Sequence, residues 1–260
     1  MKRECKSVLP IRIHRYFNLK KDHFSVEGDT SRRILFAAAE LREVRKKIVI
    51  WGAGGHALVV ADAIRAGDQY DVAGFLVDLG YNRQTRPVLA GQILGGRERI
   101  AAVLESGIEL VVVALGHCER RLELATMLEG QGFSLASVIH PRAIVAAGVE
   151  IGPGTVIAAG ATVNPGVKIE RNVIINTGAI VDHECRIGAG AHVSPGARLA
   201  GNVVVGREAW IGIGATIIDD VTIGVHTVIG AGAVVVSDIP DRVIAYGVPA
   251  KIIKTNETPA

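Results

Sequence analysis

The sequence predicts two unlike domains in one chain, a small parallel α/β sheet followed by an all-β parallel β-helix. Apolar and helix-like segments alternate between residues 47 and 138, and the first apolar segment runs into a glycine-rich turn. From residue 139 onward, an aliphatic residue recurs at every sixth position, which suits a coil with three six-residue sides. We therefore divide the chain into an extension (1–46), a sheet domain (47–138), a β-helix (139–253) and a tail (254–260).

The hexad repeat runs without a slip. Its aliphatic positions are Val145, Ile151, Ile157, Val163, Ile169, Ile175, Val181, Ile187, Val193, Leu199, Val205, Ile211, Ile217, Ile223, Ile229 and Val235. The fourth place of each hexad from 148 to 202 is Gly or Asn, except at 184, and these residues accept the positive φ of a tight corner. Each hexad should be one short strand and one corner, and residues eighteen apart should stack in coils about 4.8 Å apart.

Composition and cysteine usage narrow the class of protein. The chain is 49% hydrophobic and 21% charged, which is typical of a globular protein. Cys5, Cys118 and Cys185 are an odd, scattered set without a CxxC motif, so we expect neither a disulfide framework nor a zinc knuckle. No apolar run approaches the roughly eighteen residues of a membrane helix, and the N-terminus lacks the apolar core of a signal peptide. A cytoplasmic location is expected.

The basic charge belongs to the N-terminal extension. Residues 1–47 carry a net charge of +7 and the remainder −4, so the main body has no basic surface pattern for nucleic acid. Thr30 or Ser31 could cap a helix that ends at Lys46 and packs on the next domain. The alternative is a basic arm that visits an anionic membrane surface.

The sheet domain is predicted to be Rossmann-like. Strands are expected at 47–51, 72–77, 110–115 and 135–139, and helices at 57–66, 95–105 and 118–131. Ligands of such sheets bind beyond the carboxyl ends of the strands. The residues placed there are Gly54, Gly55, His56, Asp78, Gly116 and His117. A nucleotide or nucleotide-sugar site is favoured, and a ligand-free turn is the alternative. A nicotinamide dinucleotide site is disfavoured, since the domain is too short for a second half-sheet.

The hexad rule is broken at Glu184, which is preceded by His183. A corner that replaces its turn residue with a carboxylate beside an imidazole is a local inconsistency, and such breaks cluster at functional sites. An imidazole titrates near neutrality and can take a proton from an attacking amine or hydroxyl. Glu184 would orient the ring and stabilise its charged form. We therefore predict that His183 is a general base, against the alternative of two solvated corner residues.

Other candidate groups have simpler interpretations. Cys185 occupies the small fifth place of its hexad and is expected to be a packing residue rather than a covalent catalyst. His183, His192 and His226 form no H-x4-H pair, so no metal site is expected. His140, directly before Pro141, is expected to be a structural joint into the β-helix.

These motifs together resemble a known family. The segment Ile175-Asn-Thr-Gly-Ala-Ile-Val-Asp-His-Glu-Cys185 follows the GAGGHA turn and precedes Gly247-Val-Pro-Ala-Lys-Ile. From residue 47 to about 253, the chain resembles the hexapeptide-repeat sugar O- and N-acetyltransferases, including sialic acid O-acetyltransferases and the bacillosamine and perosamine N-acetyltransferases. The resemblance implies that the β-helix is left-handed.

The resemblance also implies roles for single residues. His183 would be the base with Glu184 as its partner, and Asn176 would lie near the acceptor amine. Acetyl-CoA would lie between two β-helices of a homotrimer, while the six crevice residues would hold the nucleotide-sugar. The implied contacts of acetyl-CoA are His192 and the main chain near Gly201, Ile213 and Ala231.

The activity implied is acetyl-CoA-dependent N-acetylation of a nucleotide-linked amino sugar, in the synthesis of bacterial surface glycans or glycoprotein sugars. O-acetylation of sialic acid or a related sugar is an alternative, and a non-catalytic nucleotide-binding scaffold is a second. Neither the nucleotide nor the sugar follows from the sequence.

Overall fold

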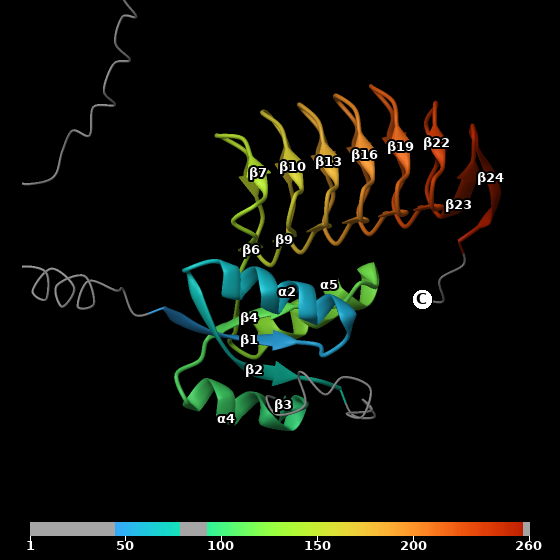
Figure 1. The fold of residues 1–260 in the computed structure, drawn as a ribbon. Helices are drawn as coiled ribbons and strands as arrows, with labels where there is room; N and C mark the ends of the chain where they lie inside the picture. The colour runs from blue at the N-terminus through green and yellow to red at the C-terminus, as the bar shows by residue number, and fades with distance from the viewer. Residues whose placement is uncertain (1–44, 79–92, 257–260) are drawn as a thin grey trace, which may run out of the picture. The chain divides into compact units, whose positions relative to one another are not determined.

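The computed structural model describes residues 45–78 and 93–256, which form a parallel sheet with its helices and a stack of coils, here called the prism (Figure 1). Most of the predicted N-terminal helix and the end of the tail lie outside these ranges. Lys46, where that helix was expected to end, instead begins strand β1. No helix within the described ranges is long and apolar enough to cross a membrane.

The sheet domain has the predicted alternation of strands and helices. Its parallel strands follow the order β3-β2-β1-β4-β5. The strands are β1 (Lys46–Trp51), β2 (Tyr70–Leu76), β3 (Ile93–Gly95), β4 (Leu110–Val113) and β5 (Ser134–Leu135). The helices are α2 (Gly55–Ala66), the 3-10 turn η2 (Arg97–Arg99), α4 (Ile100–Glu105) and α5 (Cys118–Gly130). The continuous apolar run of β1 is buried on both faces, as expected of a central parallel strand.

The two faces of this sheet are covered by different helices. Ile48 and Ile50 pack with α2, and Val49 and Trp51 on the opposite face pack with α4 and α5. Two details differ from the sequence prediction. β3 was not expected, because a three-residue strand next to Gly95 and Gly96 has no detectable period. The predicted strand at 135–139 is split, so that β5 completes this sheet and the next strand begins the prism.

The prism consists of two-residue strands spaced along the hexad repeat. They are β6 (Val138–Ile139), β7 (Ile144–Val145), β8 (Glu150–Ile151), β9 (Val156–Ile157), β10 (Thr162–Val163), β11 (Lys168–Ile169), β12 (Ile174–Ile175), β13 (Ile180–Val181), β14 (Arg186–Ile187), β15 (His192–Val193), β16 (Arg198–Leu199), β17 (Val204–Val205), β18 (Trp210–Ile211), β19 (Thr216–Ile217), β20 (Thr222–Ile223), β21 (Val228–Ile229) and β22 (Val234–Val235). Two longer strands, β23 (Val243–Gly247) and β24 (Ala250–Thr255), close the last coil as an antiparallel pair.

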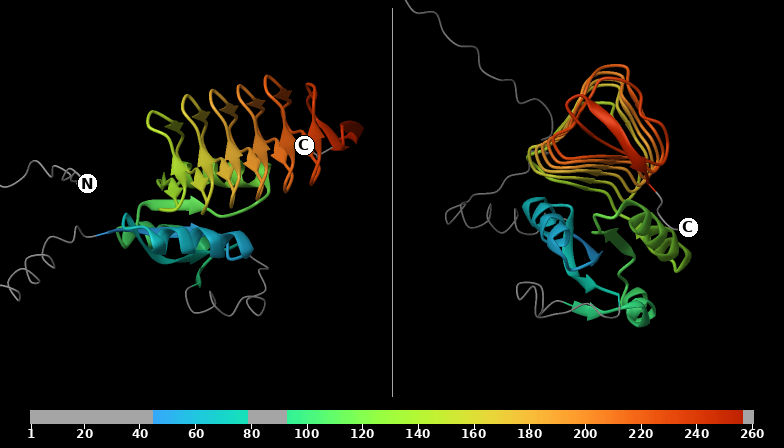
Figure 2. Two further views of the ribbon diagram at one scale, coloured as in Figure 1. Left: turned by 45° about the horizontal axis from the view of Figure 1, so that its top comes forward. Right: turned by 90° about the vertical axis from the view of Figure 1, so that its right-hand side faces the viewer.

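Strands eighteen residues apart pair in parallel and build three sheets, one on each side of the triangle (Figure 2). The coils form a left-handed parallel β-helix. We name the sheet of β6, β9, β12, β15, β18, β21, β23 and β24 the docking sheet, because hydrogen bonds join the coils on this side to the sheet domain. The predicted fold class is confirmed.

The corners of the prism from 148 to 232 use the left-handed backbone region. From 148 to 232 the fourth place of each hexad has a positive φ, between 54° and 81°. Glu184 adopts it, but so do Glu208, Asp220 and His226 further along the chain. The replacement of Gly or Asn at the fourth place of the hexad, which marked Glu184, therefore also occurs at three later corners. A left-handed non-glycine residue costs about 1–2 kcal/mol, which the surrounding ladder of backbone hydrogen bonds offsets.

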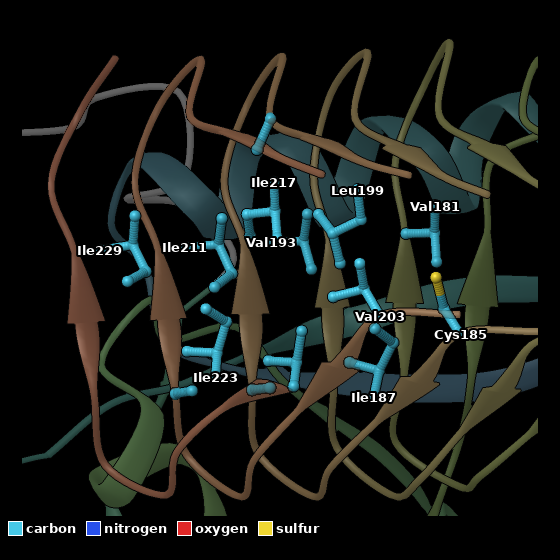
Figure 3. Close-up of a cluster of buried hydrophobic side chains, with 14 of the residues drawn as sticks. Val181, Cys185, Ile187, Val193, Leu199, Val203, Ile211, Ile217, Ile223 and Ile229 are labelled. Atoms are coloured by element: carbon cyan, nitrogen blue, oxygen red, sulfur yellow. The ribbon is translucent and has the colours of Figure 1, made fainter. Parts of the chain in front are cut away.

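The interior of the prism is a continuous apolar stack (Figure 3). Cys185 lies within it, and its thiol donates a hydrogen bond to Ala200 O at 3.1 Å. Burial raises the pKa of this thiol to about 11, so it stays protonated and is a packing residue, as predicted. His140 is also buried, and its Nδ1 accepts the N–H of Arg142 at the entry to the prism.

Candidate active site

A crevice lies at the carboxyl ends of β1, β2 and β4. It has a volume of about 420 Å³ and is lined by Trp51, Gly52, Ala53, Gly54, Val77, Asp78, Leu115, Gly116, His117 and Arg120. Four of the six predicted crevice residues, Gly54, Asp78, Gly116 and His117, therefore converge. They meet because parallel strands end at the same edge of a sheet. Gly55 opens α2 and is exposed, and His56 lies instead near the ring of His192.

Two arginines that sequence reasoning missed pair with Asp78, and one of them, Arg120, also lines this crevice. Arg120 Nη2 lies 2.8 Å from one oxygen of Asp78, and Arg97 Nε lies 3.2 Å from the other. His117 caps α5 by accepting the N–H of Arg120. A guanidinium at the mouth of a glycine-lined crevice suits a phosphate group. The available signal was the position of Arg120, in the first turn of a predicted helix directly after a predicted strand end.

A second group of side chains lies where the docking sheet meets the sheet domain. His192 is buried on β15, and its ring stacks on Trp210 at 5.5 Å between centroids. The ring of His56, from the start of α2, is 6.4 Å away. The hydrophobic period does not single out Trp210, which was not predicted as a site residue.

Hydrogen bonds fix which nitrogen of His192 carries its proton. Asn176 Oδ1 accepts the N–H of Thr177, so its Nδ2 is the atom that donates to His192 Nε2, at 3.0 Å. His192 Nδ1 must then carry the proton, which it donates to Gly116 O at 3.3 Å. His192 is thus linked on one side to Asn176 in the prism and on the other to the crevice.

The buried imidazole of His192 and the partly buried imidazole of His56 are both neutral near pH 7. Burial, with the nearby charge of Arg121, lowers the pKa of His56 to about 4. Burial, with the charges of Arg121 and His56, lowers the pKa of His192 to about 3. With so low a pKa, His192 is a weak proton acceptor, and an imidazole that is not desolvated is a better candidate for a general base.

We expect these imidazoles to make folding pH-dependent. Their folded pKa values lie below the 6.5 of free histidine, so the unfolded chain binds more protons between pH 6.5 and about 4 for His56, and between pH 6.5 and about 3 for His192. The stability they contribute is complete above that window and is lost as pH falls through it, at up to about 1.4 kcal/mol per pH unit for each group. Urea unfolding across this window measures the loss. His192→Gln should reduce the slope, and an unchanged slope in that variant would contradict the assignment.

The predicted base lies on a different part of the prism, at the corner between β13 and β14. His183 Nδ1 is 3.3 Å from Glu184 Oε2, and the side chain of His183 is 58% exposed. Its ring covers Gly201 one coil further along, where a Cβ would lie 2.4 Å from Cε1. Donation of Nδ1–H to Glu184 leaves Nε2 as the atom that can accept a proton.

Asp182 holds the backbone of this corner. Its Oδ1 accepts hydrogen bonds from Asn164 Nδ2 and from the N–H of His183, both at 2.7 Å. The Asn164 amide first, and then the His183 N–H, lower the pKa of Asp182 and keep it ionised. Sequence reasoning missed Asp182, although it directly precedes the predicted pair.

The predicted acetyl-CoA contacts are divided between two edges of the triangle. Gly201 shares the corner column of His183, between the β13–β16 and β14–β17 strands. Ile213 and Ala231 are exposed at the column between the docking sheet and its neighbour, where Asn176 also lies. A single chain therefore does not bring His183 together with Asn176, Ile213 and Ala231.

Within the described ranges, no three His, Cys, Asp or Glu side chains are grouped to hold a metal ion.

Proteins of known structure are similar to this chain in both fold and sequence. Residues 47–128 match the family model of the PglD N-terminal domain. A perosamine N-acetyltransferase from Caulobacter crescentus, a variant with one histidine replaced by asparagine, was solved with CoA and GDP-perosamine. It is 41% identical, with a TM-score of 0.76, over 81% of this chain and 98% of that one.

Two further solved structures agree. The acetyltransferase domain of PglB from Neisseria gonorrhoeae is 36% identical, with a TM-score of 0.74, over 80% of this chain and 100% of that one. WeeI from Acinetobacter baumannii is 25% identical, with a TM-score of 0.60, over 80% and 100%. Identity of this level over nearly the whole length of the Caulobacter enzyme shows that the chain belongs to the hexapeptide-repeat sugar acetyltransferase family.

Proposed function

We propose that this protein transfers the acetyl group of acetyl-CoA to the amine of a nucleotide-linked amino sugar. The observation that carries the proposal is the combination of a nucleotide-sized crevice with an imidazole–carboxylate pair on a hexapeptide prism. It is supported by the Caulobacter relative, which holds CoA and GDP-perosamine, and by the PglB domain solved with acetyl coenzyme A. The proposal includes the cytoplasmic location that the scattered cysteines favour.

The chemistry needs one base and no acyl-enzyme. His183 Nε2 takes a proton from the acceptor amine as the nitrogen attacks the thioester carbonyl carbon. The tetrahedral oxyanion then collapses, the carbon–sulfur bond breaks, and the CoA thiolate leaves with the proton returned by the imidazolium. Glu184 orients the ring for both transfers. The products are the N-acetyl sugar and CoA.

The crevice would hold the nucleotide part of the substrate. The glycine turn before α2 presents backbone N–H groups, and Arg120 adds a charge that can pair with a phosphate. Asp78 pairs with Arg97 and Arg120 and so fixes the Arg120 guanidinium at the crevice. The sugar would then extend toward Asn176 and the docking sheet.

The acetyl-CoA groove would lie between two prisms of a homotrimer. The edge with His183 and Gly201 and the edge with Ile213 and Ala231 belong to different corners of one triangle. A ring of three prisms can place the first edge of one subunit against the second edge of the next. The exposed side chains of Ile213 and Ala231 suit the apolar pantetheine arm of CoA.

Mixing two inactive variants tests whether the acetyl-CoA groove lies between two subunits. His183→Ala removes the base, and Ala231→Trp fills the proposed groove on the other edge. If the site spans two subunits, co-expressed variants should recover about one quarter of wild-type activity in randomly mixed rings. Recovery of none would place both edges of the site in the same subunit, and a single-chain mass in analytical ultracentrifugation would exclude the trimer.

A substrate screen tests the function itself. UDP-, GDP- and dTDP-linked amino sugars are incubated with acetyl-CoA, released thiol is followed, and products are analysed by mass spectrometry. We expect thiol release with one nucleotide-linked amino sugar and an acetyl group on its nitrogen. Acetylation of a hydroxyl of sialic acid would favour the O-acetyltransferase alternative. Binding of a nucleotide-sugar without thiol release from any acceptor would favour a non-catalytic scaffold.

A further inference from the structure

Arg121 is the most completely buried charged residue of the sheet domain among the described residues, with 1% of its surface exposed. It lies on α5, and its five N–H donors face five backbone carbonyls. Nη1 donates to Leu115 O and Gly116 O at 2.9 and 3.1 Å, Nε to Asn172 O at 3.0 Å, and Nη2 to Gly190 O and Ala191 O. The planar guanidinium is thus fully satisfied.

These carbonyls belong to two different parts of the molecule. Leu115 and Gly116 line the crevice at the end of β4, whereas Asn172, Gly190 and Ala191 lie on prism corners of the docking side. Asn172 Nδ2 returns a hydrogen bond to Arg121 O at 3.2 Å. One side chain therefore ties the crevice to two successive coils.

The contacts of Arg121 also bracket His192. Ala191, whose carbonyl Arg121 holds, directly precedes His192 in the chain. Gly116 O, which Arg121 also holds, is the acceptor of the His192 Nδ1 proton. Arg121 therefore holds both the backbone from which the ring extends and the carbonyl that, together with Asn176, selects its tautomer.

The charge of Arg121 is not used in an ion pair. Among the described residues, no carboxylate lies within salt-bridge distance of its guanidinium. Glu208 and Cys118 interact with it electrostatically, but burial still lowers the pKa of Arg121, because a buried cation is expensive. A neutral residue could fill the same space without that penalty. The positive charge does, however, act on both His56 and His192, and it favours their neutral forms.

We propose that Arg121 is a positioning residue of the transfer site, which locks the crevice to the coil of His192 and holds that ring as the Nδ1–H tautomer. Its kinetic consequence rests on the proposed function. A sugar held in the crevice would reach the acetyl group only if the separation between the crevice and the coil of His192 is fixed. Displacement of about 1 Å can lower a rate by roughly 10²-fold.

Arg121→Lys is the test variant, because lysine keeps the charge but has three donors for five carbonyls. We expect kcat to fall by roughly 10²-fold while KM for the nucleotide-sugar changes by only about threefold, since misplacement acts on the reacting atoms more than on binding. Equal kcat in variant and wild type would overturn the proposal.

Arg171→Lys is the matched control. Arg171 lies on a prism corner and pairs with Glu129 of α5, so it also ties α5 to the prism, but it contacts neither Gly116 nor Ala191. A purely structural role for Arg121 predicts that the two variants lose activity in proportion to their loss of melting temperature. Positioning predicts a fall in kcat for Arg121→Lys alone.

Nitrogen NMR of the histidine side chains gives a readout independent of activity. The groups facing His192 are Arg121 from α5, His56 from α2, and the uncharged Trp210 and Asn176. Wild-type His192 should be neutral with its proton on Nδ1 down to about pH 5. In Arg121→Lys both tautomers should be populated, whereas Arg171→Lys should match the wild type.

These readouts separate the two proposals. A changed His192 signal in Arg121→Lys, with no acetyl transfer by the wild type, would leave Arg121 as a positioning residue and remove the proposed function. If Arg121→Lys does not fold, the wild-type spectrum still decides. A His192 proton on Nε2, or a charged ring near pH 6, would overturn the role of Arg121.

Discussion

Replacement of His183 by alanine should lower acetyl transfer by roughly 10² to 10⁴-fold, the range typical of a lost general base. The loss should be in kcat, because the exposed ring of His183 contributes little to binding before proton transfer. Stability should change little, since the side chain is 58% exposed and its partner Glu184 is 70% exposed. Initial rates with saturating acetyl-CoA and nucleotide-sugar, beside a urea unfolding curve, measure both effects.

The chain supplies its own control for this variant. His226 and Glu208 form a second imidazole–carboxylate pair, with His226 Nδ1 at 3.1 Å from Glu208 Oε2. Both residues occupy left-handed corners, as Glu184 does. His226→Ala should keep activity within about twofold, because this pair does not face the column of Gly201. Activity retained in His183→Ala, or lost equally in both variants, would exclude His183 as the base.

Gly201→Ala should lower kcat by roughly 10²-fold without unfolding the protein. A Cβ there would lie 2.4 Å from Cε1 and 2.6 Å from Nε2 of His183, so the ring must swing outward. The ring can move because it is the exposed end of a flexible side chain. The backbone tolerates alanine, since Ala147 and Ala189 occupy the same third place in other hexads. Steady-state kinetics and a melting curve separate the two effects.

A double-mutant cycle tests whether Gly201→Ala acts through the ring of His183. If Gly201→Ala acts only by moving the imidazole, it should have no further effect on a chain that already carries His183→Ala. The rate of the double variant should then equal that of His183→Ala alone. Independent, multiplicative losses would show that Gly201 acts on the substrate directly rather than through the ring.

The prism could be predicted almost residue by residue. An aliphatic residue at each sixth position leaves only one packing, because a shift of one residue would expose the whole apolar column. The corners followed from Gly and Asn, and the structure shows the same backbone at Glu184, Glu208 and His226. The convergence of Gly54, Asp78 and Gly116 could also be predicted, since parallel strands end at one edge.

Other elements could not be predicted, for identifiable reasons. β3 is three residues long, and the segment at 135–139 serves two sheets, so neither shows a complete period. Arg120 and Arg97 acquire their roles from Asp78, which is distant in sequence from both. Arg121 could not be distinguished in the sequence from an ordinary helix residue, because its five hydrogen-bond acceptors are backbone carbonyls, which residues of every type carry.

The sequence by itself determined which local conformations form, since period, corner residues and strand ends are properties of neighbouring residues. It therefore predicted the fold class, the pair His183 and Glu184, and the crevice. Only the tertiary structure decided that His192 is buried and linked to Gly116, and that His183 lies on another edge from Ala231. The reason is physical: burial and hydrogen-bond partners depend on which surfaces meet, and surfaces distant in sequence meet only in the folded chain.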